Sequence, residues 1–155
     1  MDISLIKQFD SGARIYQGAA PDEWITHFQS PGRNVMLVEM AAGVNALEWV
    51  RQGTIRSVLY FGIDDSPESC LDDDVLCALA RSCRAWLDDP KGDVIFGCAA
   101  GVSRSSYADC ATLMAKLKVP FDEAIAIVRA GRPIANPNSG FTAHLRRLED
   151  RLKNL

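Results

Sequence analysis

Apolar and polar residues alternate along this chain with two different periods, and the alternation predicts strands and helices in turn. Short runs rich in apolar and β-branched residues indicate strands at 13–17, 35–40, 55–61 and 93–96. The stretch 71–87 repeats apolar residues at helical spacing, and further helices are expected at 21–28, 45–53, 105–118, 121–130 and 139–152. Strands that alternate with helices predict an α/β fold, with a central, mainly parallel sheet flanked by helices.

The segment between the 93–96 strand and the 105–118 helix carries the most specific chemistry. It reads Cys98, Ala99, Ala100, Gly101, Val102, Ser103 and Arg104. A short loop that opens a helix directs backbone N–H groups inward at the positive end of the helix dipole, and so forms an anion cradle. The same field favours a cysteine thiolate as a nucleophile, and the planar fork of Arg104 suits two oxygens of a phosphoryl group. The loop 98–104 therefore predicts phosphate binding and phosphoryl transfer through Cys98, with Arg104 holding the transferred group.

Composition is that of one globular catalytic domain over residues 1–155. The chain is 48% hydrophobic and 24% charged, and its net charge of −3 argues against nucleic acid or an anionic membrane as the main partner. No apolar stretch is long enough to span a membrane, and the N-terminus lacks the pattern of a signal peptide. Five cysteines without paired spacing indicate a reducing compartment, so the expected location is the cytoplasm. Neither histidine has a second ligand at metal-binding spacing, and no metal or other cofactor is expected.

Three further blocks accompany the loop in a fixed order: Arg14–Gly18, Tyr60–Pro67, and the stretch from Ala124 to Phe141 with its Arg132-Pro133 and Pro137-Asn138-Ser139-Gly140-Phe141 segments. Together with the loop they resemble the dual-specificity protein phosphatases, small members of the cysteine-dependent phosphatase superfamily. The resemblance implies a protein phosphatase that forms a cysteinyl-phosphate intermediate. Its substrates would be phosphoproteins carrying phosphotyrosine and also phosphoserine or phosphothreonine. The oligomeric state is left open.

The resemblance also implies roles for residues outside the loop. Asp65 best fits the position of the general acid, with Asp64 as the alternative, whereas the aspartates at 72–74 fit a solvated helix N-terminus. The Ser105 hydroxyl can bond to the Cys98 sulfur, and the family implies that this bond helps the thiolate to leave. Asn138 resembles a residue that braces the catalytic loop, and a simple turn asparagine is the other interpretation.

Two departures from the family pattern bear on activity. Position 97 is glycine, where the family almost always has a histidine that supports the loop, so either activation of Cys98 is weaker or a neighbouring side chain fills that space. Asp109 replaces an aliphatic residue in the helix after the loop. Two other functions therefore remain open: a phosphatase acting on a glycan, nucleotide or lipid phosphate, and a weakly active phosphate-binding pseudophosphatase. No lysine lies between Cys98 and Arg104, which counts against a lipid substrate.

Overall fold

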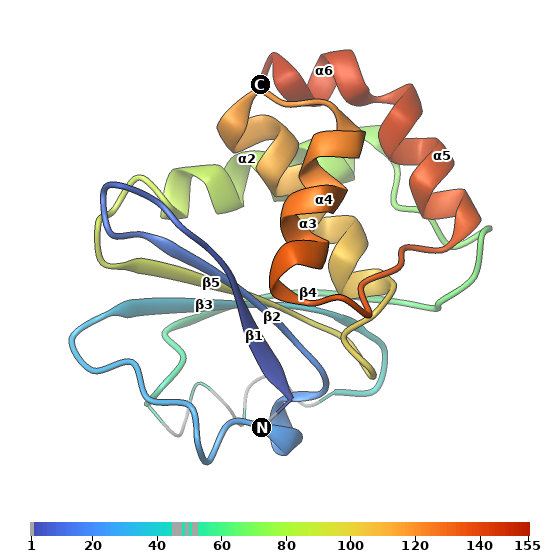
Figure 1. Ribbon diagram of the computed structural model, residues 1–155. Helices are drawn as coiled ribbons and strands as arrows, with labels where there is room; N and C mark the ends of the chain where they lie inside the picture. Colours follow the sequence, from blue (N-terminus) through green and yellow to red (C-terminus); the bar gives the residue numbers. More distant parts are fainter. Residues whose placement is uncertain (1, 45–47, 49, 51–52) are drawn as a thin grey trace.

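A five-stranded sheet organises the molecule, seen here in a computed structural model that describes residues 2–44, 48, 50 and 53–155 (Figure 1). The strands are β1 (Ile3–Gln8), β2 (Arg14–Gly18), β3 (Asn34–Ala41), β4 (Ser57–Ile63) and β5 (Gly92–Gly97). Their order across the sheet is β1-β2-β5-β3-β4. The β1–β2 pair is antiparallel and every other pair is parallel. The carboxyl ends of β2, β5, β3 and β4 therefore meet at one edge of the sheet, where ligands of open α/β folds bind.

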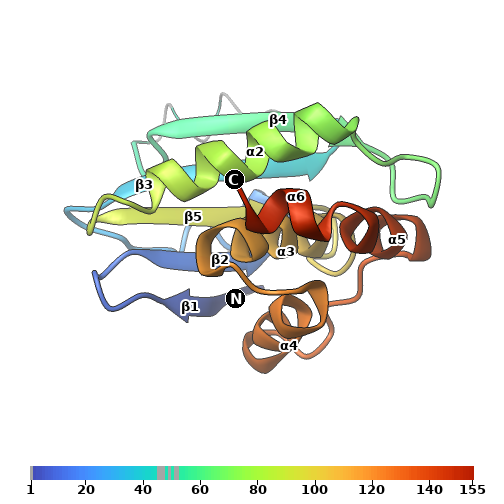
Figure 2. The same ribbon diagram turned by 90° about the horizontal axis from the view of Figure 1, so that it is seen from above.

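All the labelled α-helices lie on one face of the sheet (Figure 2). They are α2 (Asp73–Trp86), α3 (Arg104–Leu117), α4 (Phe121–Gly131), α5 (Ser139–Arg147) and α6 (Glu149–Lys153). The opposite face is covered by irregular chain and by the short 3-10 helix η1 (Pro21–Glu23). This arrangement is a mainly parallel α/β sheet, as the sequence predicts.

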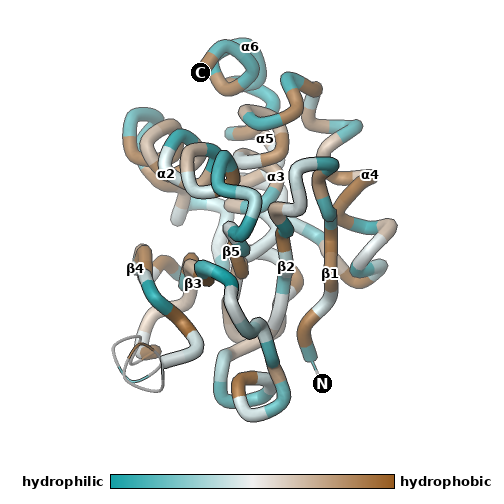
Figure 3. The backbone as a smooth tube through the Cα atoms, turned by 90° about the vertical axis from the view of Figure 1, so that its left-hand side faces the viewer, coloured by the Kyte–Doolittle hydropathy of each residue, from teal (hydrophilic) through white to brown (hydrophobic). Residues whose placement is uncertain are grey.

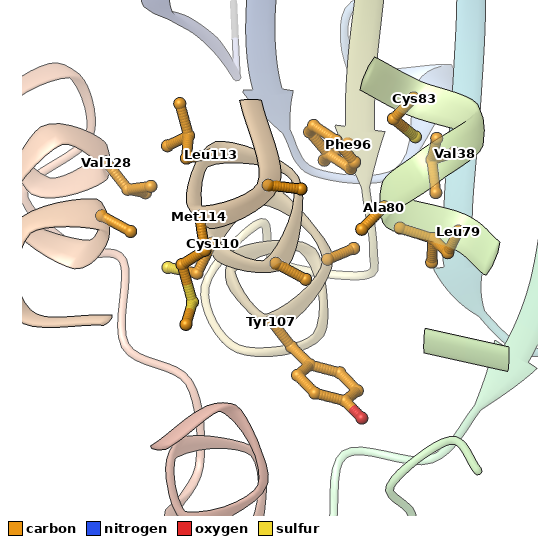
Figure 4. Packing of buried hydrophobic residues seen from close by; sticks show 14 of the residues in the cluster. Val38, Leu79, Ala80, Cys83, Phe96, Tyr107, Cys110, Leu113, Met114 and Val128 are labelled. Carbon is orange, nitrogen blue, oxygen red and sulfur yellow. The ribbon is translucent and has the colours of Figure 1, made fainter. Parts of the chain in front are cut away.

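The two faces of the sheet bury separate hydrophobic clusters because side chains alternate along each strand. On the helical face, one cluster contains Phe96 and Val38 of the sheet, Cys83 of α2, and Cys110 and Met114 of α3 (Figure 4). On the other face, Trp24 and Phe28 cluster with strand side chains that point away from the helices, among them Leu37 and Ile95. Hydrophobic and hydrophilic residues alternate along α2 in Figure 3, which is the pattern of a helix with one buried side.

The structure corrects three expected elements. Strand β1 lies outside the predicted strands, because it is a sheet-edge strand with one buried side chain, Ile6, and a register shift between Leu5 and Lys7 that interrupts its alternation. The segment 21–28 forms only η1 followed by turns, and the expected 139–152 helix divides into α5 and α6 at Leu148. The helix expected at 45–53 falls largely on residues 45–47, 49 and 51–52, outside the described residues. No helix in the described part of the chain is long and apolar enough to cross a membrane.

Candidate active site

The loop 98–104 lies at the carboxyl edge of the sheet, between the end of β5 at Gly97 and the start of α3 at Arg104. Cys98 is buried, with 2% of its surface exposed, whereas Ala99 and Ala100 are exposed. The thiol therefore sits at the bottom of the loop, and small side chains form its rim. Larger side chains at these two positions would crowd the approach of an oxyanion to the backbone.

The carbonyl groups of the loop bond outward to surrounding residues. Ala99 O accepts from Ala20 N at 3.3 Å, and Val102 O accepts from Asn136 N at 2.8 Å. Between them, Ala100 O and Gly101 O accept from Arg132, at 3.2 Å from Nη2 and 2.7 Å from Nε. Because N–H and C=O point in opposite directions across a trans peptide, the amide groups of residues 100–103 are directed into the loop. The backbone is thus prearranged as an anion cradle.

Arg132 and Gln17 brace this cradle, and neither role follows from sequence spacing. Arg132 is buried, and besides the two loop carbonyls it donates to Ser4 Oγ and pairs with the Asp2 carboxylate. Gln17, also buried, donates to Gly101 O at 3.2 Å and to Ser106 Oγ at 2.8 Å. Both residues lie far from the loop in sequence. The available signals were the Arg132-Pro133 dipeptide and a lone amide at the end of an apolar strand.

Gly101 is the position where the cradle requires glycine. Its φ of +67° is in the left-handed region, which favours a residue without a side chain. A Cβ there would lie 2.6 Å from Arg132 Nη2 and 2.7 Å from the carbonyl carbon of Gly18. The close approach of the brace and the left-handed turn therefore both depend on this glycine.

Cys98 and Arg104 each have a partner that fixes them. Cys98 Sγ lies 3.3 Å from the Oγ of Ser105, which is buried in the first turn of α3. Arg104 Nη1 donates to Ile63 O, the carbonyl at the end of β4, at 3.0 Å. The guanidinium is held from one side, which leaves its remaining N–H groups for other acceptors.

Asp65 is connected to the cradle through Asn138. The Asn138 amide Nδ2 donates to Asp65 Oδ1 at 3.0 Å, and its backbone N–H donates to Ser103 Oγ at 2.9 Å. The Asn138 Oδ1 also caps α5 by accepting from Phe141 N at 3.0 Å. Asp64 is exposed as well, but among the described residues no such hydrogen bond reaches its carboxylate. The predicted acid and brace therefore lie together, two hydrogen bonds from the loop.

Glu39 occupies the space beside Gly97. The two residues are register partners on β3 and β5, and a Cβ on Gly97 would lie 3.0 Å from Glu39 Oε2. Of the two explanations for glycine at position 97, the structure therefore supports a neighbouring side chain that fills the site. Burial raises the pKa of Glu39 to about 7, against the opposing effects of its hydrogen bond from Ala41 N and of the Arg104 charge. A lone carboxylate in the apolar run 35–40 was the sequence signal for this residue.

A largely buried chain of polar side chains anchors the end of the acid loop, the segment between β4 and α2 that contains Asp65. The Tyr107 hydroxyl lies 2.6 Å from His144 Nδ1 and accepts from Leu71 N at 3.2 Å. His144 Nε2 lies 2.8 Å from Asp73 Oδ1. Hydrogen bonds from Arg147 and His144 hold the pKa of Asp73 well below its usual range. This chain links the end of the acid loop to α3 and α5. Asp73 thus has a structural role besides its place at a solvated helix N-terminus.

Within the described residues, no group of three or more histidine, cysteine or acidic side chains is placed to hold a metal ion.

Comparisons with known proteins find similarity to dual-specificity phosphatases. The family profile "Dual specificity phosphatase, catalytic domain" matches residues 80–151. The Homo sapiens protein "Dual specificity protein phosphatase 13B" is 41% identical over 97 residues, which cover 62% of this chain and 48% of that relative. The chain thus spans about half the length of this curated relative.

Solved structures show the same fold at low identity. Human DUSP28 has a TM-score of 0.70 and 20% identity, over 97% of this chain and 95% of that one. The human tyrosine phosphatase-like serine/threonine/tyrosine-interacting protein has a TM-score of 0.71 and 18% identity, over 96% of both chains. At these identities the structural likeness establishes the fold alone.

Proposed function

The chain belongs to the dual-specificity phosphatase family of cysteine-dependent hydrolases, and we propose that it dephosphorylates phosphoproteins through a cysteinyl-phosphate intermediate. The observation that carries the proposal is the position of the Cys98 thiol at the base of a loop whose carbonyls at residues 99–102 are bonded outward. Such a cradle presents N–H donors to the three non-bridging oxygens of a phosphate and brings the phosphorus to the sulfur.

In the first step the Cys98 thiolate attacks phosphorus and the bond from phosphorus to the side-chain oxygen breaks. Arg104 is suited to hold two of the phosphoryl oxygens in one plane, because a guanidinium is a fork of parallel donors. Asp65 gives its proton to the leaving oxygen. Its hydrogen bond to Asn138 supports this assignment, because it fixes the carboxyl beside the cradle.

In the second step water attacks the phosphocysteine while Asp65 takes a proton from that water, and the bond from phosphorus to sulfur breaks. The contact between Cys98 Sγ and Ser105 Oγ supports a role for Ser105 here, because a hydroxyl that donates to the sulfur stabilises the departing thiolate. Inorganic phosphate leaves, and the enzyme returns to its starting state.

The rim of the cradle supports a broad substrate class. Ala99 and Ala100 are small and exposed, so they leave room for phosphotyrosine and for the shorter phosphoserine and phosphothreonine side chains. The five cysteines are all free thiols, which supports a reducing compartment such as the cytoplasm. We propose that residues 1–155 form one catalytic domain that acts on phosphorylated proteins.

Two substitutions test the mechanism. Cys98→Ser is expected to abolish release of phosphate from para-nitrophenyl phosphate, because an alcohol is a poor nucleophile without a base. Arg104→Lys should also lose most turnover, because an ammonium cannot bond two oxygens in plane. Cys70→Ser, a matched change of a cysteine outside the loop, should keep the wild-type rate.

Wild-type turnover in a clean Cys98→Ser preparation would overturn the mechanism. Wild-type protein that binds phosphopeptide but never releases phosphate would instead identify a binding module. A panel of phosphopeptides, phosphoglycans, nucleotides and inositides then tests the substrate class, and a clear preference for any non-protein phosphate would contradict the phosphoprotein proposal.

A further inference from the structure

Glu39 is a buried carboxyl whose hydrogen bonds are incomplete. It lies on β3 among apolar neighbours and is fully shielded from solvent. Its Oε1 accepts from Ala41 N at 3.1 Å, whereas Oε2 has no hydrogen-bond partner among the described residues. An ionised carboxylate in such a site is strongly disfavoured unless another charge compensates it.

The carboxyl lies beside Gly97, the residue that directly precedes the catalytic loop. Its Oε2 is the nearest atom to the position that a Gly97 side chain would take, and Gly97 is joined to the nucleophile Cys98. The other neighbours of that position, Leu37 and Ala19, bring no titratable group. Tyr60, the register partner on β4, is the titratable side chain beside Glu39 across the sheet, and Arg104 of α3 is the cation whose charge acts on Glu39.

When Glu39 is ionised, the charge of Arg104 therefore acts both on the Glu39 carboxylate and on any oxyanion in the cradle. The same positive charge that would hold a phosphoryl dianion also acts electrostatically on the buried carboxylate. A dianion in the cradle and an anion behind it repel each other across a poorly screened protein interior. A neutral Glu39 leaves the full charge of Arg104 to the oxyanion.

We propose that Glu39 is a positioning residue that couples oxyanion binding in the 98–104 cradle to the uptake of a proton. When Glu39 is neutral, the cradle binds a phosphoryl group tightly. When Glu39 is ionised, the cradle binds the phosphoryl group weakly. The relevance of this inference to turnover rests on the proposed function, but the coupling itself concerns only anion binding.

The coupling is reciprocal. If the proton on Glu39 strengthens anion binding, then a bound anion must raise the pKa of Glu39 by the same free energy. The pKa of Glu39 is raised by burial to about 7, so small changes of pH around neutrality shift its protonation and with it the affinity of the cradle.

Sulfate binding to the Cys98→Ser protein tests the proposal without turnover. Sulfate remains a dianion over the range in which Glu39 titrates, and the serine removes titration of the nucleophile. We expect sulfate affinity to fall roughly tenfold as pH rises through neutrality, the size of one poorly screened charge interaction. In Cys98→Ser/Glu39→Gln the affinity should stay at its high, low-pH value, because the amide keeps the acceptor for Ala41 N and carries no charge. Cys98→Ser/Glu123→Gln, an exposed carboxyl on α4, should retain the parental pH profile.

The same pH profile with and without Glu39 would overturn the proposal. Should the glutamine variant fail to fold, a ¹³C titration of the Glu39 carboxyl in the Cys98→Ser protein decides instead. Saturating sulfate should raise its titration midpoint, and an unchanged midpoint would equally overturn the coupling. Because sulfate is never turned over, these results are independent of whether Cys98 forms a phosphoenzyme.

Discussion

Asp64 and Asp65 stand next to each other after β4, but only Asp65 accepts a hydrogen bond from Asn138 among the described residues. We expect Asp65→Asn to lower turnover of a phosphopeptide by about 100-fold, the usual scale for a general acid. The loss should be smaller on an aryl phosphate with a good leaving group, which needs little protonation.

Asp64→Asn is the matched control for this measurement, since it makes the same chemical change one residue away. A larger loss for Asp64→Asn, or equal losses on both substrates, would transfer the acid role from Asp65.

Asp109 is a second residue whose chemistry conflicts with its surroundings. It is fully buried in α3, and both carboxylate oxygens lack hydrogen-bond partners in the described structure. Burial raises the pKa of Asp109 well above its usual value, and burial, with a smaller effect of Asp109, also raises the pKa of the Cys83 and Cys110 thiols. The folded protein therefore carries a buried carboxyl whose charged form is disfavoured and whose oxygens make no hydrogen bond among the described residues.

Asp109→Leu is expected to stabilise the protein by about 1–3 kcal/mol, because it removes an unsatisfied polar group from an apolar site. Urea unfolding at neutral pH measures the change. Asp109→Asn, which keeps a polar group there, should gain much less. A destabilised leucine variant would show that the site cannot accommodate the different shape.

At the scale of elements, Asn138 at the N-terminus of α5 has two functions. The side-chain oxygen caps the helix, and the side-chain NH₂ holds Asp65. Asn138→Asp should keep the cap, because aspartate is an equally good N-cap, but should lose turnover because two carboxylates then face each other. Asn138→Ala should lose turnover and also about 1 kcal/mol of stability.

Urea unfolding and phosphopeptide turnover, measured on both variants, separate these two functions. Full activity in a well-folded Asn138→Asp protein would show that the contact with Asp65 has no role in the reaction.

The elements also show which features the sequence could predict. The strand–loop–helix unit around Cys98 was predictable because its pattern is local: an apolar run, a small-residue loop and a helical repeat are consecutive. The hydrogen bonds of Arg132 and Gln17 to the loop were not predictable, because only the tertiary fold brings these residues together. Gln17 reaches the loop through the parallel pairing of β2 with β5, and Arg132 reaches it from the end of α4. The contact of Glu39 with Gly97 likewise depends on the register between β3 and β5. Sequence resemblance indicated that position 97 was unusual, but only the register identifies the side chain that fills it.

At the scale of the whole molecule, two buried carboxyls make stability depend on pH in opposite directions. Asp93 of β5 pairs with Arg14 and Arg33. Burial works against its charge, but hydrogen bonds from Arg14, Arg33 and Ser30 hold the pKa of Asp93 below its usual value. Its contribution is present above the unfolded pKa and is lost as pH falls through the folded pKa. Glu39 has the opposite sign, because its pKa is raised on folding.

Between pH 4.5 and about 7 the folded chain holds the Glu39 proton that the unfolded chain releases. The folded state then binds more protons, so the free energy of unfolding falls as pH rises through this window. The expected loss from Glu39 is about 3 kcal/mol, and Asp109 adds to it in the same direction. Urea unfolding across the window should show this slope in the wild type and a smaller one in Glu39→Gln, which keeps only the part due to Asp109. Parallel profiles would mean that Glu39 titrates alike in both states.

The hydrogen bond from Arg104 to the Ile63 carbonyl has a consequence for the thermodynamics of substrate binding. A free arginine side chain carries about 2 kcal/mol of rotamer entropy, which it loses when it is ordered. Here much of that entropy is lost on folding rather than on substrate binding, because the end of β4 fixes one side of the guanidinium. A phosphoryl group that reaches the cradle therefore meets an ordered fork, and its binding enthalpy is offset less by the ordering of protein. Loosening the segment after β4 would raise this entropic cost and weaken binding without removing any group that contacts the phosphate.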